Sequence, residues 1–187
     1  MAKRVFLIHG WGGTPEGGWR LWLRDNLEKR GFSVSIPKMP ETDHPKMRAW
    51  VDHLSKTVGE PDENCYFIGH SLGCTTILRY LETLGPDKKV GGSVLVAGPV
   101  ERKNTDELQN FFTEPFEWEK IKSRCRKFIA IYSDNDSLVS LKNGVILEER
   151  LGAKLIVQHG MGHFSGAMDG VKELPIALDS VLELEKL

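Results

Sequence analysis

The sequence has few cysteines and no long hydrophobic run. Its 187 residues include an odd number of cysteines without the spacing of a metal site: Cys65, Cys74 and Cys125. They predict reduced thiols, as is usual in the cytoplasm, rather than a disulfide framework. No apolar stretch approaches the roughly 20 residues that a transmembrane helix needs, and the N-terminal segment lacks the pattern of a signal peptide. We therefore expect a soluble, cytoplasmic protein.

Net charge is also nearly absent. The 25 Lys and Arg residues and the 26 Asp and Glu residues give a formal net charge of −1. Proteins that bind nucleic acid or anionic membranes usually carry a basic surface, so we expect neither partner. Hydrophobic residues make up 40% of the chain and charged residues 27%, values typical of folded globular proteins. The length suits one compact domain, which we expect to span residues 1–187.

Short apolar runs alternate with longer segments of helical periodicity. The runs predict six strands: Arg4–His9, Ser33–Ile36, Cys65–Gly69, Ser93–Ala97, Lys127–Tyr132 and Lys154–Gln158. The segments between and after them predict helices that begin near Pro15, Met47, Ser71, Lys142 and Leu174. Most of the strands are continuously apolar, as expected for strands that are buried on both faces. The sequence therefore predicts an α/β fold, with a parallel sheet between two layers of helices.

One segment, residues 101–126, departs from this alternation. It is rich in charge and is interrupted by Pro115, yet it carries four aromatic residues: Phe111, Phe112, Phe116 and Trp118. It lies between the end of one predicted strand and the start of the next. We expect a short, partly helical, cap-like insertion over the C-terminal edge of the sheet.

The strongest chemical motif follows the third predicted strand. Ligands of open parallel sheets bind beyond the C-terminal ends of the strands. There the sequence Gly69-His70-Ser71-Leu72-Gly73 forms a G-x-S-x-G pattern between a strand and a helix. Glycines allow a sharp turn that exposes the serine hydroxyl. The pattern predicts Ser71 as a nucleophile, and a serine that caps the helix in a glycine-rich turn is the alternative.

A serine nucleophile needs a general base and an acid that orients it. Two histidines follow the last predicted strand, and we favour His163 over His159 as the base. Two aspartates follow the fifth strand, and we favour Asp136 over Asp134 as the acid. The resulting order, serine, aspartate, histidine, is the order of the α/β-hydrolases rather than of the other common triads.

Acyl transfer also needs N–H donors for the negative charge that develops on the carbonyl oxygen. The backbone of Leu72 supplies one donor at the start of a helix, where the dipole favours an anion. The glycine-rich loop after the first strand supplies the other, and we expect the N–H of Trp11, with Gly12 second. A phosphate-binding loop is the competing interpretation, but the loop lacks both the P-loop and the dinucleotide-binding patterns.

Taken together, these motifs resemble the α/β-hydrolase superfamily. The match is to its small, compact serine hydrolases, the group that includes the retinoblastoma-binding hydrolase and its bacterial relatives. The matching pieces are Phe6–Trp11, Phe67–Gly73, Ser133–Asp136 and Gly162–Phe164. The resemblance implies a three-layer sandwich whose six strands lie in the order 2-1-3-4-5-6. It also implies a triad of Ser71, Asp136 and His163. Ser137 and Ser140 depart from the pattern, because many relatives carry proline at one or both places.

The expected function is a carboxylesterase-like serine hydrolase that cleaves a small ester, thioester or amide without a metal or cofactor. Its partner is then a small-molecule acyl substrate. An aromatic acyl pocket is one expectation, and ordinary core packing of the same residues is equally open: Trp11, Phe111, Phe112, Phe116, Trp118 and Phe164. Two other functions stay open. One is a protein-interaction module with minor turnover, and the other is acyl transfer to an acceptor other than water.

Overall fold

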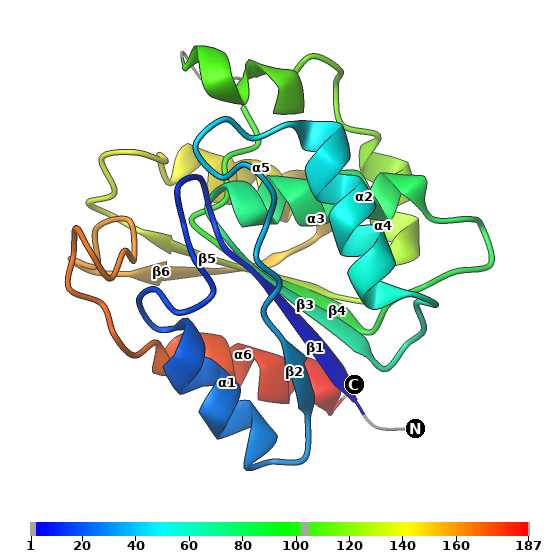
Figure 1. Ribbon diagram of the computed structural model, residues 1–187, viewed down its shortest axis with the longest axis horizontal. Helices are drawn as coiled ribbons and strands as arrows, with labels where there is room; N and C mark the ends of the chain where they lie inside the picture. The colour runs from blue at the N-terminus through cyan, green and yellow to red at the C-terminus, as the bar shows by residue number, and fades with distance from the viewer. Residues whose placement is uncertain (1–2, 102–104, 187) are drawn as a thin grey trace.

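Six short strands form one parallel sheet at the centre of the protein (Figure 1). The computed structural model describes residues 3–101 and 105–186. The strands lie in the order β2-β1-β3-β4-β5-β6, which confirms the predicted α/β fold and strand order. Their bounds are β1 Arg4–Ile8, β2 Ser33–Ser35, β3 Cys65–His70, β4 Gly92–Val96, β5 Phe128–Ser133 and β6 Lys154–Gln158.

The burial of the strands explains their composition. All residues of the three central strands β3, β4 and β5 are buried, and the edge strands β2 and β6 are partly exposed. A strand covered on both faces has no place for alternating polar residues. This is why the central strands appear in the sequence as unbroken apolar runs.

Helices cover both faces of the sheet (Figure 1). One layer contains α1, Arg20–Glu28, and α6, Pro175–Glu185. The opposite layer contains α2 Met47–Val58, α3 Leu72–Thr83, α4 Trp118–Arg124 and α5 Lys142–Leu151. Each layer has its own hydrophobic core: Trp19, Leu23 and Leu27 pack in the first, and Trp50 and Leu54 pack in the second.

The strand order determines where in the sheet the predicted site lies. From β1 the chain passes outward to β2 and then returns to β3 on the other side of β1. Loops that leave β1 and β3 at their C-terminal ends therefore diverge to opposite sides, and such a switch point opens a crevice for ligands. The glycine-rich loop after β1 and the serine turn after β3 both lie at this point.

The expected insertion is partly helical, as predicted. Its described part contains a 3₁₀-helix, Asp106–Phe111, and α4, whereas residues 102–104 lie outside the described residues. Phe111 is fully buried against Trp50, with ring centroids 5.8 Å apart. Asn110 Oδ1 accepts a hydrogen bond from the backbone N–H of Met47, 2.6 Å away. The segment is therefore bound to the helical layer that contains α2.

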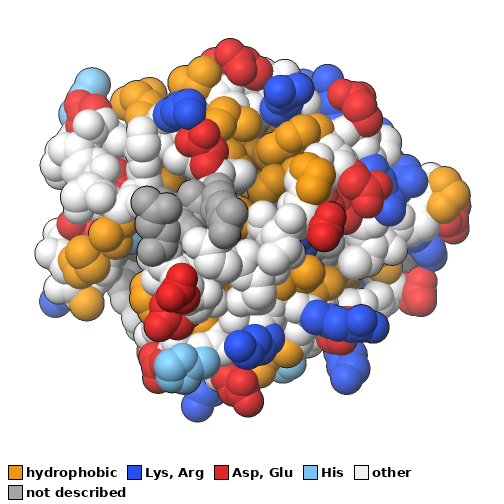
Figure 2. Space-filling view, turned by 90° about the horizontal axis from the view of Figure 1, so that it is seen from above, with side chains coloured by type: hydrophobic (Ala, Val, Ile, Leu, Met, Phe, Trp, Pro, Cys, Tyr) orange, Lys and Arg blue, Asp and Glu red, His pale blue; other side chains and the backbone are white. Residues whose placement is uncertain are grey.

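The surface carries charges of both signs. Seen from above in Figure 2, acidic and basic side chains alternate across that face with hydrophobic side chains between them. This mixing agrees with the nearly balanced formal charge. The three cysteines are free and buried. Over the described part of the chain, every helix falls short of the length and hydrophobicity needed to cross a bilayer.

Candidate active site

Ser71 occupies a strained turn between β3 and α3. Its backbone dihedral angles are φ 55° and ψ −124°, in a region that non-glycine residues rarely adopt. Such a conformation costs on the order of 1–3 kcal/mol and persists only where the surroundings impose it. Here the Ser71 N–H donates to the carbonyl oxygen of Val96, 2.9 Å away on the neighbouring strand. The turn leaves the Ser71 side chain at the wall of a cavity.

The glycines of the motif are required by close packing. A Cβ atom at Gly69 would lie 2.6 Å from the backbone nitrogen of Cys74, and one at Gly73 would overlap the carbonyl of Ile8. Across the cavity, a Cβ atom at Gly10 would lie 2.9 Å from the Cβ atom of Ser71. Side chains at these places would push α3 and the loop after β1 away from the serine turn.

His163 and Asp136 form a buried pair. His163 Nδ1 lies 2.8 Å from Asp136 Oδ2, and the two side chains are 9% and 0% exposed. Asp136 Oδ1 accepts hydrogen bonds from the backbone N–H groups of Leu138, at 2.8 Å, and Val139, at 2.9 Å. Burial alone would raise the pKa of Asp136, but the hydrogen bonds from His163 and Val139 hold that pKa below its usual value. Asp136 is therefore a carboxylate at neutral pH, with partners on both oxygens.

The alternative pair, His159 and Asp134, lies in solvent. His159 Nδ1 is 2.6 Å from Asp134 Oδ2, but the two side chains are 85% and 42% exposed. Neither residue lines the cavity that contains Ser71. The geometry thus brings Ser71 together with His163, and leaves the alternative pair outside.

The loop that carries His163 is held from several sides. His70 Nε2 donates to the His163 carbonyl at 2.8 Å, and Asp169 Oδ2 accepts from the His163 N–H at 3.0 Å. Burial, and then the neighbouring His163, lower the pKa of His70 to about 3, so the His70 ring is neutral. Phe164 is fully buried, and its carbonyl accepts from the Trp19 indole N–H. Sequence reasoning missed the contacts of His70 and Asp169 with this loop, and the one signal was that His70 lies inside the G-x-S-x-G motif.

Three consecutive side chains of the loop after β5 bind the loop after β6. Asp134 accepts from the backbone of Gly160, Asn135 accepts from the N–H of Gly162 at 2.8 Å, and Asp136 binds the His163 ring. The two loops therefore share one hydrogen-bond network.

The backbone N–H groups near Ser71 fall into two groups, those already bonded within the protein and those left free to bind a ligand. In the loop after β1, the N–H of Gly12 donates to Thr42 and the N–H of Gly13 donates to Gly10. Over the described residues, the N–H groups of Trp11 and Leu72 have no acceptor within hydrogen-bond distance. His9 fixes this loop, because its Nδ1 bonds the Gly10 carbonyl at 2.9 Å. The geometry therefore favours Trp11 over Gly12 as the second donor.

Ser71 and His163 line one cavity of about 510 Å³. Besides these two, the wall contains Gly10, Trp11, Gly12, Gly13, Thr14, Gly17, Gly18, Arg20, His70, Leu138, Ser165, Gly166, Ala167 and Met168. Over the described residues, no group of three His, Cys, Asp or Glu side chains is placed to hold a metal ion.

Of the six aromatic residues considered for an acyl pocket, only Trp11 lines the Ser71 cavity. Phe111 and Phe164 are fully buried in the two hydrophobic cores. Phe112, Phe116 and Trp118 line a different, smaller hollow beside the insertion. Large aromatic side chains gain more from core burial than from lining an open cleft. The alternative interpretation of these residues as packing holds.

Comparisons with known proteins show which family the chain belongs to. The Bacillus subtilis protein YdeN is 35% identical over 181 residues, which cover 96% of this chain and 94% of YdeN. The crystal structure of YdeN matches over the full length of both chains, with a TM-score of 0.94 and 31% identity. The rat serine hydrolase RBBP9 is 30% identical over 159 residues, 83% of either chain.

More distant structures share only the fold. A carboxylesterase of the archaeon Nitrososphaera gargenis has a TM-score of 0.75 at 16% identity, and the match covers 99% of this chain and 92% of that one. The family model described as serine hydrolase matches residues 5–182. With nearly the whole sequence covered, this chain belongs to the serine hydrolase family.

Proposed function

We propose that the protein is a carboxylesterase-like hydrolase that cleaves a small ester, thioester or amide through an acyl-enzyme on Ser71. The observation that carries the proposal is that Ser71 and His163 share a cavity while His163 Nδ1 is bound to the buried Asp136. With Nδ1 occupied, Nε2 is the ring nitrogen left to accept a proton. An imidazole held in this tautomer is what a serine nucleophile needs.

The reaction then has two halves. Ser71 Oγ attacks the substrate carbonyl while His163 Nε2 takes the hydroxyl proton, and Asp136 stabilises the resulting imidazolium. The N–H groups of Trp11 and Leu72 hold the oxyanion. The bond to the leaving group breaks, and the leaving group receives the proton from His163. Water then attacks the acyl-enzyme while His163 Nε2 takes a proton from it. The bond between the acyl carbon and Ser71 Oγ breaks, the acid is released, and Oγ receives the proton from His163.

A fluorophosphonate probe tests the proposal. We expect it to label the protein covalently, and we expect no labelling of Ser71→Ala or His163→Ala. The exposed His159 provides a matched control, and His159→Ala should be labelled like the wild type. Absence of labelling in a wild-type protein that circular dichroism shows to be folded would reject the hydrolase and favour an interaction module.

A further inference from the structure

Two arginines are buried in the described part of the chain. Arg20 is 7% exposed and Arg79 is 6% exposed. A buried charge is costly unless other groups compensate it, so the partners of each guanidinium show what it is there to do.

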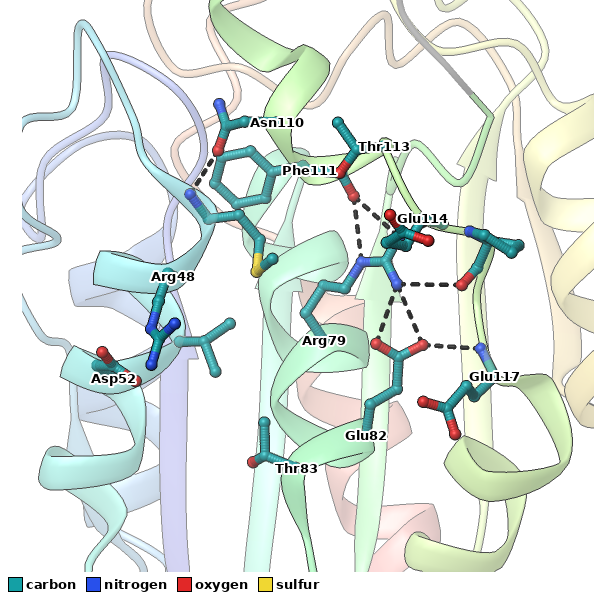
Figure 3. Close-up of a pocket in the computed structure, with 13 residues that line it drawn as sticks. Arg48, Asp52, Arg79, Glu82, Thr83, Asn110, Phe111, Thr113, Glu114 and Glu117 are labelled. Carbon is teal, nitrogen blue, oxygen red and sulfur yellow. Dashed lines mark hydrogen bonds and ion pairs between the residues drawn. The ribbon is translucent and has the colours of Figure 1, made fainter.

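The buried charge of Arg79 is fully compensated by groups of the protein (Figure 3). Its guanidinium donates to the carbonyl oxygens of Phe111 and Glu114 and forms an ion pair with Glu82 at 3.0 Å. It also stacks over the ring of Phe116, 4.0 Å from the centroid. These contacts tie the insertion to α3, and the positive charge is neutralised within the protein.

Among the described residues, Arg20 has no direct counter-ion; the charge of Glu16 acts on it from beyond ion-pair distance and partly offsets the effect of burial on its pKa. It is the first residue of α1, and its Nε donates to the Thr14 carbonyl at 2.8 Å. Across the residues that the structure describes, no carboxylate lies within 4.0 Å of its guanidinium, and the bond from Nε is the one hydrogen bond that the guanidinium makes. Burial lowers the pKa of Arg20 to about 10, so the side chain is still protonated at neutral pH.

The unpaired guanidinium lies at the wall of the Ser71 cavity. Room for it depends on Gly17, another residue of that wall, because a Cβ atom there would overlap a terminal nitrogen of Arg20. The wall has no aspartate or glutamate among its described residues, so Arg20 is its one permanent charge. Exposed apolar side chains complete the same wall: Trp11, Leu138 and Met168.

We propose that Arg20 binds a carboxylate on the substrate, so that the site selects acyl compounds that carry a negative charge on the acyl group or on the leaving group. The inference rests on the proposed function, because it names the substrate class of the same site. A carboxylate offers two oxygens to the two terminal nitrogens, a geometry in which arginine forms strong, charge-assisted hydrogen bonds. The substrate would thus supply the direct counter-ion that Glu16, beyond ion-pair distance, does not.

Two matched pairs of esters test this proposal. In the first pair the charge is on the acyl group: the p-nitrophenyl monoester of adipic acid against p-nitrophenyl hexanoate. In the second it is on the leaving group: 4-acetoxybenzoate against 4-acetoxybenzamide. We expect the wild type to prefer the anionic member of at least one pair in kcat/KM, and Arg20→Gln to reduce that ratio by about tenfold or more.

Two control variants sharpen the result. Arg20→Lys keeps the charge and should recover part of the anionic preference. Arg24→Gln removes an exposed charge one turn later in the same helix, paired with Asp25, and should leave the ratio unchanged. If Arg20→Gln does not fold, adipate should still inhibit the wild type more strongly than adipamide does. A ratio that is the same in wild type and Arg20→Gln, or equal inhibition by the two compounds, would overturn the proposal.

A measurement of substrate binding distinguishes this proposal from the proposed function. In a Ser71→Ala background the adipate monoester stays intact, and calorimetry should show weaker binding when Arg20→Gln is added. If the wild type hydrolyses none of the four esters, the proposed function fails, and the calorimetric comparison still decides the role of Arg20. If hydrolysis depends on Ser71 but neither ratio nor binding depends on Arg20, only the carboxylate proposal fails.

Discussion

His70 Nε2 donates a hydrogen bond to the backbone carbonyl of His163 at 2.8 Å, between residues 93 positions apart in the sequence. Their rings lie 5.1 Å apart, centroid to centroid. The residue before the predicted nucleophile therefore holds the loop that carries the predicted base. Because the neutral His70 ring is the donor, this contact is independent of pH over the neutral range.

Replacing His70 tests this positioning role. His70→Phe keeps a ring but removes the donor, so the His163 loop loses one support. We expect kcat on p-nitrophenyl acetate to fall by about tenfold to a hundredfold, with KM nearly unchanged, because small displacements of a reacting group are costly. His44→Phe, at an exposed histidine, is the control. An unchanged kcat in His70→Phe would show that the remaining contacts suffice.

Replacing the predicted acid of the triad, Asp136, should lower both activity and stability. Asp136→Asn removes the carboxylate that orients His163, and kcat should fall by about 10⁴-fold. Since folding lowers the pKa of Asp136, its charge stabilises the folded state above the unfolded pKa of about 3.9, and this contribution disappears as pH falls through the lower, folded value. Thermal melts should show the wild type more stable than Asp136→Asn at pH 7, with the difference vanishing in acid.

Asp134→Asn is the matched control for that series. Asp134 is exposed and pairs with His159 outside the cavity. Wild-type kcat is expected for this variant. A large loss of kcat in Asp134→Asn would instead identify the exposed pair as the working one.

The strain at Ser71 predicts an unusual order of stability. Glycine adopts a φ of 55° without penalty, whereas alanine does not. We expect Ser71→Gly to be more stable than Ser71→Ala by about 1 kcal/mol in urea unfolding, with both inactive. At Ser55, an exposed position within α2, the order should be reversed, because glycine is unfavourable in helices. The same order at both sites would mean that the turn is not strained.

The size of the cavity predicts a preference for short acyl chains. A volume of about 510 Å³ accommodates a small ester, and Trp11 is the one aromatic residue among the described residues of its wall besides the two histidines. In a series of p-nitrophenyl esters, kcat/KM should be highest for short chains and decline toward long ones. Activity that rises steadily with chain length contradicts this prediction.

Local chemistry made much of this fold and site predictable. The strands could be found because strands that are buried on both faces have little room for polar residues. The turn at Ser71 could be predicted because Gly69 and Gly73 must be glycine for α3 to start so close to β1. The choice between His163 and His159 was harder, because both lie in one loop. What separates them is the burial of Phe164 and the hydrogen bonds that the backbone N–H groups of His163 and Ser165 donate to Asp169, which are tertiary contacts.

Other features had no sequence signal at all. An aromatic residue such as Phe111 is equally suited to a pocket wall and to a core, and only the position of Trp50 decides between them. Arg20 lies in an amphipathic helix where an arginine is ordinarily solvated. Its burial results from the glycines of the preceding loop and from the cavity beside them, and both depend on the folded chain.

The shared network between the loops after β5 and β6 limits how this enzyme can be recombined. Asp134, Asn135 and Asp136 each have their own partner on the second loop, so a graft that brings in one loop from a relative breaks several contacts at once. Chimeras should tolerate exchange of both segments as a matched pair and fail when either is exchanged alone. Directed evolution of the specificity of this protein should therefore vary the two loops together.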